Sequence, residues 1–287
     1  MKARYINPFT DFGFKKIFAE EASKILLIDF LNNLLPESHI VTLSFKDKEQ
    51  TGHAEEDRKA VYDIYCENDK GEKIIIELQK AKQNYFKDRT IYYSTFPIQE
   101  QAAKGEWNYE LKSVFCVGIL DFKFDEDKLS NGEVIHTVQL KDHHNQVFYD
   151  KLKFVYVEMP HFNKAESQLE TRLDKWLYFI KHLEDFQFIP EIFKDEIFEK
   201  AFEKAEIAKY TEIERHEYEQ SLKTYRDLKG VIDTAFDDGK LEGKLEGINE
   251  GKLQRNFEIA KSLKENGIPV DIIMKTTGLT SLQIERL

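Results

Sequence analysis

The stretch VYDIYCENDKGEKIIIELQKAK, residues 61–82, places a carboxylate inside each of two apolar runs. Both runs are rich in β-branched and aromatic residues, and the turn-forming segment ENDKG joins them, a pattern that predicts a β-hairpin. Asp63 would lie on one strand and Glu77 on the next. Glu77 and Gln79 would share a strand face, because alternate residues of a strand point the same way. With a suitable register, all three side chains converge.

Two carboxylates at half-buried strand positions need a physical reason. An isolated ionised carboxylate is costly to bury, and two close together repel each other. A divalent cation removes both costs by taking the carboxylate oxygens as ligands. Mg²⁺, or Mn²⁺ in its place, suits a site of one or two carboxylates with room for water and a substrate phosphate. The alternative is that Asp63 and Glu77 only form salt bridges within a structural sheet.

The composition is that of a globular protein. Its 287 residues can form one sizeable domain with a smaller appendage, and 41% of them are hydrophobic. The net charge of −11 argues against binding nucleic acid by bulk electrostatics, so any contact with DNA must be local or bridged by metal. No apolar run approaches the roughly 18 residues of a membrane span, and we expect a cytoplasmic protein. Cys66 and Cys116 lie in apolar runs without metal spacing and are expected to be buried free thiols.

The order of the patterns predicts an α/β core in residues 1–160. A helix is expected at 19–34, closed by Pro36, and another at 84–104. The predicted strands are 39–46, 59–66, 72–79, 111–120, 133–140 and 153–160. Residues 161–229 are charged and helical, and their aromatic residues are expected to cover the sheet. The core is thus a helix, a three-stranded β-meander, a helix and a strand, followed by an α-helical C-terminal extension.

The last part of the chain carries a glycine repeat in residues 230–255. Gly239, Gly243, Gly247 and Gly251 stand four residues apart with apolar residues between them. The segment is either a flexible acidic linker or a helix whose smooth side packs closely on another helix, and the second reading favours a homodimer. Residues 256–287 resemble a small helix-turn-helix tail, with Thr280 or Ser281 as an N-cap.

The two acids also carry a family resemblance. Asp63, with Glu77-Leu78-Gln79 starting fourteen positions later, resembles the core of PD-(D/E)XK nucleases. The whole chain resembles the Rpn family of recombination-promoting nucleases, also described as putative transposases. The matching segments are DFGFKKIF, DRKAVYDIYCEN, IIIELQKA, YFKDRTIYYS, QAAKGEWNYELKSVFCVGIL and GLTSLQIERL.

The resemblance implies a restriction-endonuclease-like fold and Mg²⁺-dependent hydrolysis of DNA that would serve recombination or mobile elements. Asp63 and Glu77 would hold the metal, and the Leu78 carbonyl could add a ligand. Gln79 stands where the superfamily has a lysine; an amide can orient water but carries no charge. The rival reading is therefore a degenerate nuclease fold that acts as a DNA-binding or protein-interaction module.

Further residues are candidates for substrate binding. Arg89 and Tyr93 are four apart on a predicted helix and share a face that could meet a phosphate, although an exposed helix surface explains them equally well. Lys82 belongs to the same local cluster of positive charge. Asp11 and Lys15 fall in the N-terminal motif, where Asp11 is either a helix N-cap or a substrate contact.

Three other polar residues have weaker support. Asp57 precedes the first strand of the hairpin and is either a catalytic acid or an ordinary turn residue. His143 and His144 lie in a polar loop without metal spacing and are expected to have no role in the chemistry. Lys80 should lie on the strand face opposite Gln79.

Overall fold

The computed structural model describes residues 3–50, 60–102, 108–124 and 132–287. The chain divides into two compact units, Met1–Leu228 and Lys229–Leu287. Asp57 lies outside the described residues. No helix in the described part of the chain is long and apolar enough to cross a membrane.

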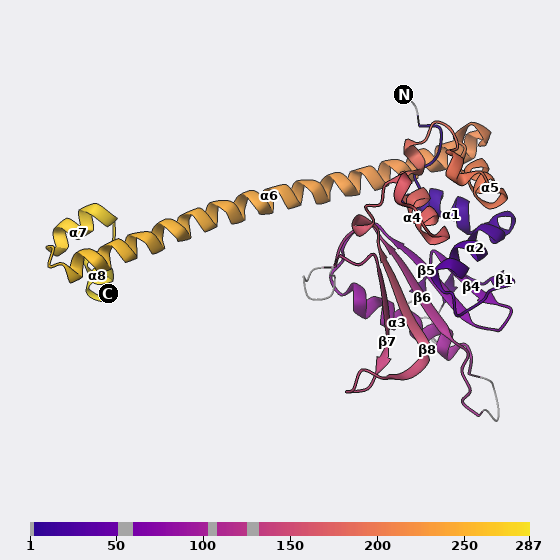
Figure 1. Ribbon diagram of the computed structural model, residues 1–287, viewed down its shortest axis with the longest axis horizontal. Coiled ribbons are helices and arrows are strands. Elements are labelled where there is room, and N and C mark those ends of the chain that lie inside the picture. The colour runs from indigo at the N-terminus through magenta and orange to yellow at the C-terminus, as the bar shows by residue number, and fades with distance from the viewer. Residues whose placement is uncertain (1–2, 51–59, 103–107, 125–131) are drawn as a thin grey trace. The chain divides into compact units, whose positions relative to one another are not determined.

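The first unit is built on a six-stranded mixed sheet with the order β1-β4-β5-β6-β8-β7 (Figure 1). Its strands are β1 (Leu43–Phe45), β4 (Ile64–Asn68), β5 (Lys73–Gln79), β6 (Val114–Leu120), β7 (Ile135–Lys141) and β8 (Val147–Glu158). The three central strands β5, β6 and β8 run parallel, and the outer pairs are antiparallel. The carboxyl ends of the parallel strands therefore meet at one edge, where α/β proteins commonly bind ligands.

The predicted core order is confirmed. Strands β1, β4 and β5 form the antiparallel meander, helix α3 (Phe86–Gln99) crosses over, and β6 returns parallel beside β5. A mixed α/β sheet of this order fits a restriction-endonuclease-like fold. The chain must cross over by a helix here because parallel neighbours cannot be joined by a tight turn.

Helices cover both faces of the sheet (Figure 1). On one face of the sheet, Ile74, Ile76 and Leu78 of β5 belong to the larger hydrophobic core; this is called the first face. On the other face, Ile75 packs with α3 in the smaller core. The helices of the first face are α1 (Asp11–Phe18), α2 (Lys24–Leu34), α4 (Arg172–His182) and α5 (Glu196–Ala205). Single-turn helices are η1 (Glu21–Ser23), η2 (Met159–His161), η3 (Glu166–Gln168), η4 (Leu183–Asp185), η5 (Glu191–Phe193) and η6 (Ile207–Lys209). The aromatic residues predicted to cover the sheet do so: Trp176, Phe179 and Phe198 are fully buried in the larger core.

Two local predictions are corrected. The strand expected at 59–66 is broken at residues 62–63: β3 (Ala60–Val61) pairs with β2 (Glu49–Gln50) in a separate ladder, and β4 begins at Ile64. In addition, Thr10 and not Asp11 caps α1, because the Thr10 side chain accepts a hydrogen bond from the Gly13 N–H. The buried free thiols are as expected at Cys66 and Cys116.

The second unit contains most of the long helix α6 (Glu212–Glu265), then α7 (Val270–Thr277) and α8 (Ser281–Glu285). The glycine repeat is helical, and, apart from adjacent residues and the helix's own backbone, no described atom lies within 4 Å of a Cβ added at Gly239, Gly243, Gly247 or Gly251. Ala260, Ile273, Leu279 and Ile284 form a small core around the last turns. Thr280 is the N-cap of α8, one of the two residues expected there.

Candidate active site

Asp63 lies in the bend between β3 and β4, where the ladder of β4 with β5 stops. The last paired residues are Ile64 and Ile76, so the Leu78 amide extends past the end of β4. The Asp63 Oδ2 accepts a hydrogen bond from the Leu78 N–H at 2.7 Å. The carboxylate thus takes the place of a strand carbonyl, and this contact fixes it beside the end of β5.

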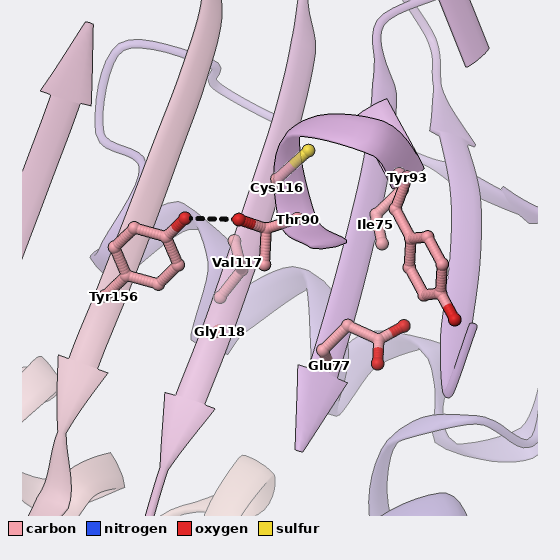
Figure 2. A pocket seen from close by; sticks show the side chains of 8 residues that line it. All are labelled: Ile75, Glu77, Thr90, Tyr93, Cys116, Val117, Gly118 and Tyr156. Atoms are coloured by element: carbon pink, nitrogen blue, oxygen red, sulfur yellow. Dashed lines mark hydrogen bonds between the residues drawn. The ribbon is translucent and has the colours of Figure 1, made fainter. Parts of the chain in front are cut away.

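Glu77 projects from β5 toward α3 (Figure 2). It stands opposite Gly118 of β6 in the parallel ladder, and its side chain borders a cavity of about 10 Å³, with space for roughly one water, together with Thr90, Tyr93 and Cys116. The Glu77 Oε1 is buried and has no hydrogen-bond partner among the described residues. A buried carboxylate oxygen without a donor is uncommon and implies a missing proton or cation.

Both carboxyl groups resist ionisation. Burial raises the pKa of Glu77 to about 8, and the neighbouring Asp63 charge adds to this effect, while Arg89 opposes it. Burial also raises the pKa of Asp63, against the Leu78 amide and the Lys15 charge, which lower it. Neither carboxylate lies within ion-pair distance of a lysine or arginine of the described chain. This observation speaks against salt bridges as the reason for the pair.

Gln79 is buried and engaged at both ends of its amide. Its Oε1 accepts a hydrogen bond from Arg89 Nη2 at 2.5 Å, and its Nε2 donates to the Ala81 carbonyl at 2.8 Å. Arg89 also donates to Gln83 Oε1 at 2.6 Å, and its guanidinium lies over the rings of Phe86 and Tyr93. Gln79 therefore anchors an arginine close to Glu77.

This geometry coincides with a match to a known family. A family model described as "PD-(D/E)XK nuclease family transposase" matches residues 8–235. The chain belongs to this family. The resemblance to recombination-promoting nucleases is thereby confirmed at the level of the family. No curated protein and no solved structure matches the chain.

The sheet edge that carries Asp63 and Glu77 is the candidate metal site of this chain. PD-(D/E)XK nucleases generally use divalent metals. Between residues 3 and 287, leaving out the undescribed segments, no three histidine, cysteine or acidic side chains group closely enough to hold a metal. A cation here would depend on two carboxylates with backbone and water oxygens, which is the ligand set that Mg²⁺ accepts.

Lysines approach Asp63 from the side of α1. Burial lowers the pKa values of Lys48 and Lys80, while the charges of Asp11 and Asp63 raise them. Lys48 is held there by backbone pairing, because its carbonyl accepts a hydrogen bond from the Tyr62 N–H at 3.0 Å. Sequence reasoning missed Lys48, which lies in no motif; only the folding of its segment against residue 62 brings it to the site.

The other candidate residues occupy different surroundings. Asp11 and Lys15 form an ion pair of 2.7 Å on α1, and both line a pocket with Lys48. Tyr93 borders the Glu77 cavity, whereas Lys82 lines a separate pocket at the start of α3. His143 and His144 are exposed and lie away from the acidic pair, at the turn between β7 and β8.

Proposed function

We propose that this protein is a metal-dependent DNA endonuclease that hydrolyses phosphodiester bonds, with a role in DNA recombination or in mobile elements. The observation that carries the proposal is the proximity of Asp63 and Glu77 at the end of β5, where Glu77 Oε1 is buried and has no hydrogen-bond partner within the described part of the chain. A nuclease family supports a nuclease-type activity on DNA.

The donor set fits Mg²⁺ or Mn²⁺. Asp63 and Glu77 supply carboxylate oxygens whose charges are unfavourable without a cation. The N–H and C=O of one strand residue point to the same side, so the Leu78 carbonyl faces the side on which Asp63 binds the Leu78 N–H. When bound, the metal would lower the pKa of a water molecule and so supply the nucleophile.

The protein's own cations flank the acids. Arg89 from α3 is positioned by Gln79 and can hold a phosphate oxygen near Glu77, with Tyr93 beside it. Lys15 and Lys48 stand on the side of Asp63, and Asp11 keeps Lys15 in place by its ion pair. In this proposal Gln79 positions Arg89 and also orients the attacking water. Lys82 contacts DNA farther along the strand.

A non-enzymatic alternative rests on Gln79. Its amide oxygen accepts from Arg89 and its amide nitrogen donates to Ala81, so one acceptor site and one N–H of this buried group are already used within the protein. A site in this state could bind DNA or another protein without cleaving. The endonuclease requires Asp63 and Glu77 for cleavage, whereas the non-enzymatic module does not cleave DNA at all.

Plasmid nicking decides between them. The parent protein, Asp63→Asn and Glu77→Gln are incubated with supercoiled DNA in Mg²⁺, Mn²⁺ or EDTA. The endonuclease predicts cleavage by the parent only, and only with metal. Equal cleavage by parent and Asp63→Asn would reject the assignment, while DNA binding without cleavage in all samples would favour the non-enzymatic module.

The same function favours a homodimer, because cutting both strands of a duplex requires two sites. The glycine repeat of α6 offers a surface for it: glycines drift only about 40° per four-residue step, so they form a smooth stripe. Leu241, Leu245, Ile248 and Leu253 lie among the glycines and are exposed. Residues 230–287 hold eight basic and ten acidic side chains, which makes association a better use than reading DNA.

A further inference from the structure

A second pocket lies at the start of α3, one helical turn from Arg89. It has a volume of about 270 Å³ and is walled by the aromatic rings of Tyr85, Phe122 and Phe124, with Lys82, Lys87 and Gln83 at its border. Its size falls just below the roughly 300 Å³ at which pockets for small molecules begin. The volume is enough for a single ring system.

Tyr85 is an unusual residue for its position. It precedes α3 with φ of 61°, in the left-handed region, and its side chain forms no capping hydrogen bond. A bulky side chain is rare in this conformation, where asparagine or glycine is favoured. The Tyr85 side chain is also 81% exposed, so neither backbone geometry nor core packing accounts for the ring.

Two lysines, Lys82 and Lys87, and one acid, Asp88, lie beside the aromatic walls. The Lys87 ammonium lies 5.1 Å from the centre of the Phe124 ring. Residues 80–104 carry five lysine or arginine residues against two acidic ones, in a chain whose net charge is −11. Aromatic rings beside lysines are the combination by which proteins hold unpaired bases and the adjoining phosphates.

Hydrogen bonds through Arg89 connect the pocket to the candidate active site. The Arg89 N–H donates to the Tyr85 carbonyl at 2.9 Å, so the backbone of Tyr85 lies one turn before Arg89 at the start of α3. Gln83 at the pocket border accepts a hydrogen bond from Arg89, which in turn binds Gln79. One helical turn is about 5.4 Å and a nucleotide rises about 3.4 Å, so the pocket lies one or two nucleotides from a phosphate held by Arg89.

From this arrangement we infer that the pocket at Tyr85 binds an unpaired nucleobase of the DNA strand being cut. In a duplex both faces of a base are stacked on its neighbours, so a ring can enter the pocket only from a single strand, a strand end or a locally opened duplex. The inference rests on the proposed function and adds a substrate class to it, namely DNA with unpaired nucleotides near the cleaved bond.

Binding measured in EDTA tests the pocket apart from catalysis. Fluorescence anisotropy of the full-length protein is recorded with a labelled single strand, with the duplex of the same sequence, and with that duplex carrying a bulge. The parent should bind the single strand and the bulged duplex more tightly than the plain duplex. Tyr85→Asn, which suits the left-handed backbone, should weaken binding of the first two by roughly 5- to 100-fold and leave the plain duplex unchanged.

Two further variants complete the test. Tyr85→Phe keeps the ring and should bind as the parent does. Tyr109 has φ of 63° and is 80% exposed but does not line the pocket, so Tyr109→Asn is a matched control that should change nothing. Unchanged single-strand binding by a folded Tyr85→Asn protein, or an equal loss with plain duplex, would overturn the inference.

The nuclease proposal fails by a different result, namely plasmid nicking that is indifferent to Asp63 and Glu77. Selective loss of single-strand binding in Tyr85→Asn would support the pocket even in that case. Absence of binding to all three DNA probes would count against both.

Discussion

The Asp63 carboxylate occupies the hydrogen-bonding position that a strand carbonyl would fill opposite Leu78. Its Oδ2 lies 2.7 Å from the Leu78 N, just past the last paired residues of β4 and β5. A side chain in this role is fixed by the sheet itself. The relationship explains how a carboxylate can be held beside Glu77 although both acids have raised pKa values.

The first prediction separates this structural role of Asp63 from its proposed catalytic role. Asp63→Asn keeps a side-chain oxygen for the Leu78 N–H but loses the negative charge, whereas Asp63→Ala loses both. Cleavage should fall roughly 100-fold or more in each variant. The melting temperature should fall clearly only in Asp63→Ala, since an orphaned buried N–H costs about 1–3 kcal/mol. Nicking assays and thermal melts measure the two effects, and a cleaving Asp63→Asn protein would disprove the catalytic role.

The second prediction concerns pH. Burial raises the pKa of Glu77 from 4.5 to about 8, so between these values the folded protein holds a proton that the unfolded chain has released. The contribution of Glu77 to stability therefore decreases as the pH rises through this window. Melting of the metal-free protein in EDTA, followed from about pH 5 to pH 9, should show this decrease, and Glu77→Gln should flatten it. Identical profiles for the two proteins would mean that Glu77 ionises normally.

The third prediction concerns the position of the superfamily lysine. The sequence alone suggests that Gln79→Lys would keep or raise cleavage. The structure adds a cost, because the new ammonium would face the Arg89 guanidinium in place of the amide oxygen that Arg89 now binds. We expect Gln79→Lys alone to lower the melting temperature, and Gln79→Lys with Arg89→Gln to recover it. Cleavage by the double variant then reports whether lysine serves the reaction; equal melting of the two variants would contradict the proposed repulsion.

The fourth prediction tests the glycine stripe. In an isolated helix each Gly→Ala change should stabilise by about 0.5–1 kcal/mol, and open space surrounds Gly243 and Gly247 within the protomer. If the stripe is a dimer contact, Gly243→Ala with Gly247→Ala should instead weaken association by blocking close approach. Light scattering over a concentration series measures the mass. Truncation after residue 229 should give a monomer, and an unchanged mass would show that the glycine helix is only a connector.

The fifth prediction concerns Gly118 in the first unit, which unlike Gly243 and Gly247 has no room for a side chain. A side chain at Gly118 would lie 3.0 Å from the Tyr156 ring, in the strand beside Glu77. Gly118→Ala should therefore destabilise the protein by about 1–3 kcal/mol, as overpacking does in a filled core. Denaturant unfolding measures this change, and a neutral result would mean that the Tyr156 ring moves aside freely.

The sequence by itself determined the order of the core elements and the faces of β5. Period-two alternation in KIIIELQ separates Ile74, Ile76 and Leu78 from Ile75, Glu77 and Gln79, and the two sets do pack on opposite faces. Local signals also predicted the helical tail and limited the cap of its last helix to Thr280 or Ser281, of which Thr280 is the cap. These features depend on residues close in the chain, whose geometry is set by strand and helix periodicity.

Only the tertiary structure decided how the site is assembled. The site depends on contacts between residues ten or more positions apart. These are the hydrogen bond from Leu78 to Asp63, the hydrogen bond from Arg89 to Gln79 and the approach of Lys48 to Asp63. Such contacts depend on strand register and helix packing, and no local pattern encodes them. The sequence could therefore single out Asp63 and Glu77 as candidates, whereas burial and long-range pairing determined their pKa values and the cations around them.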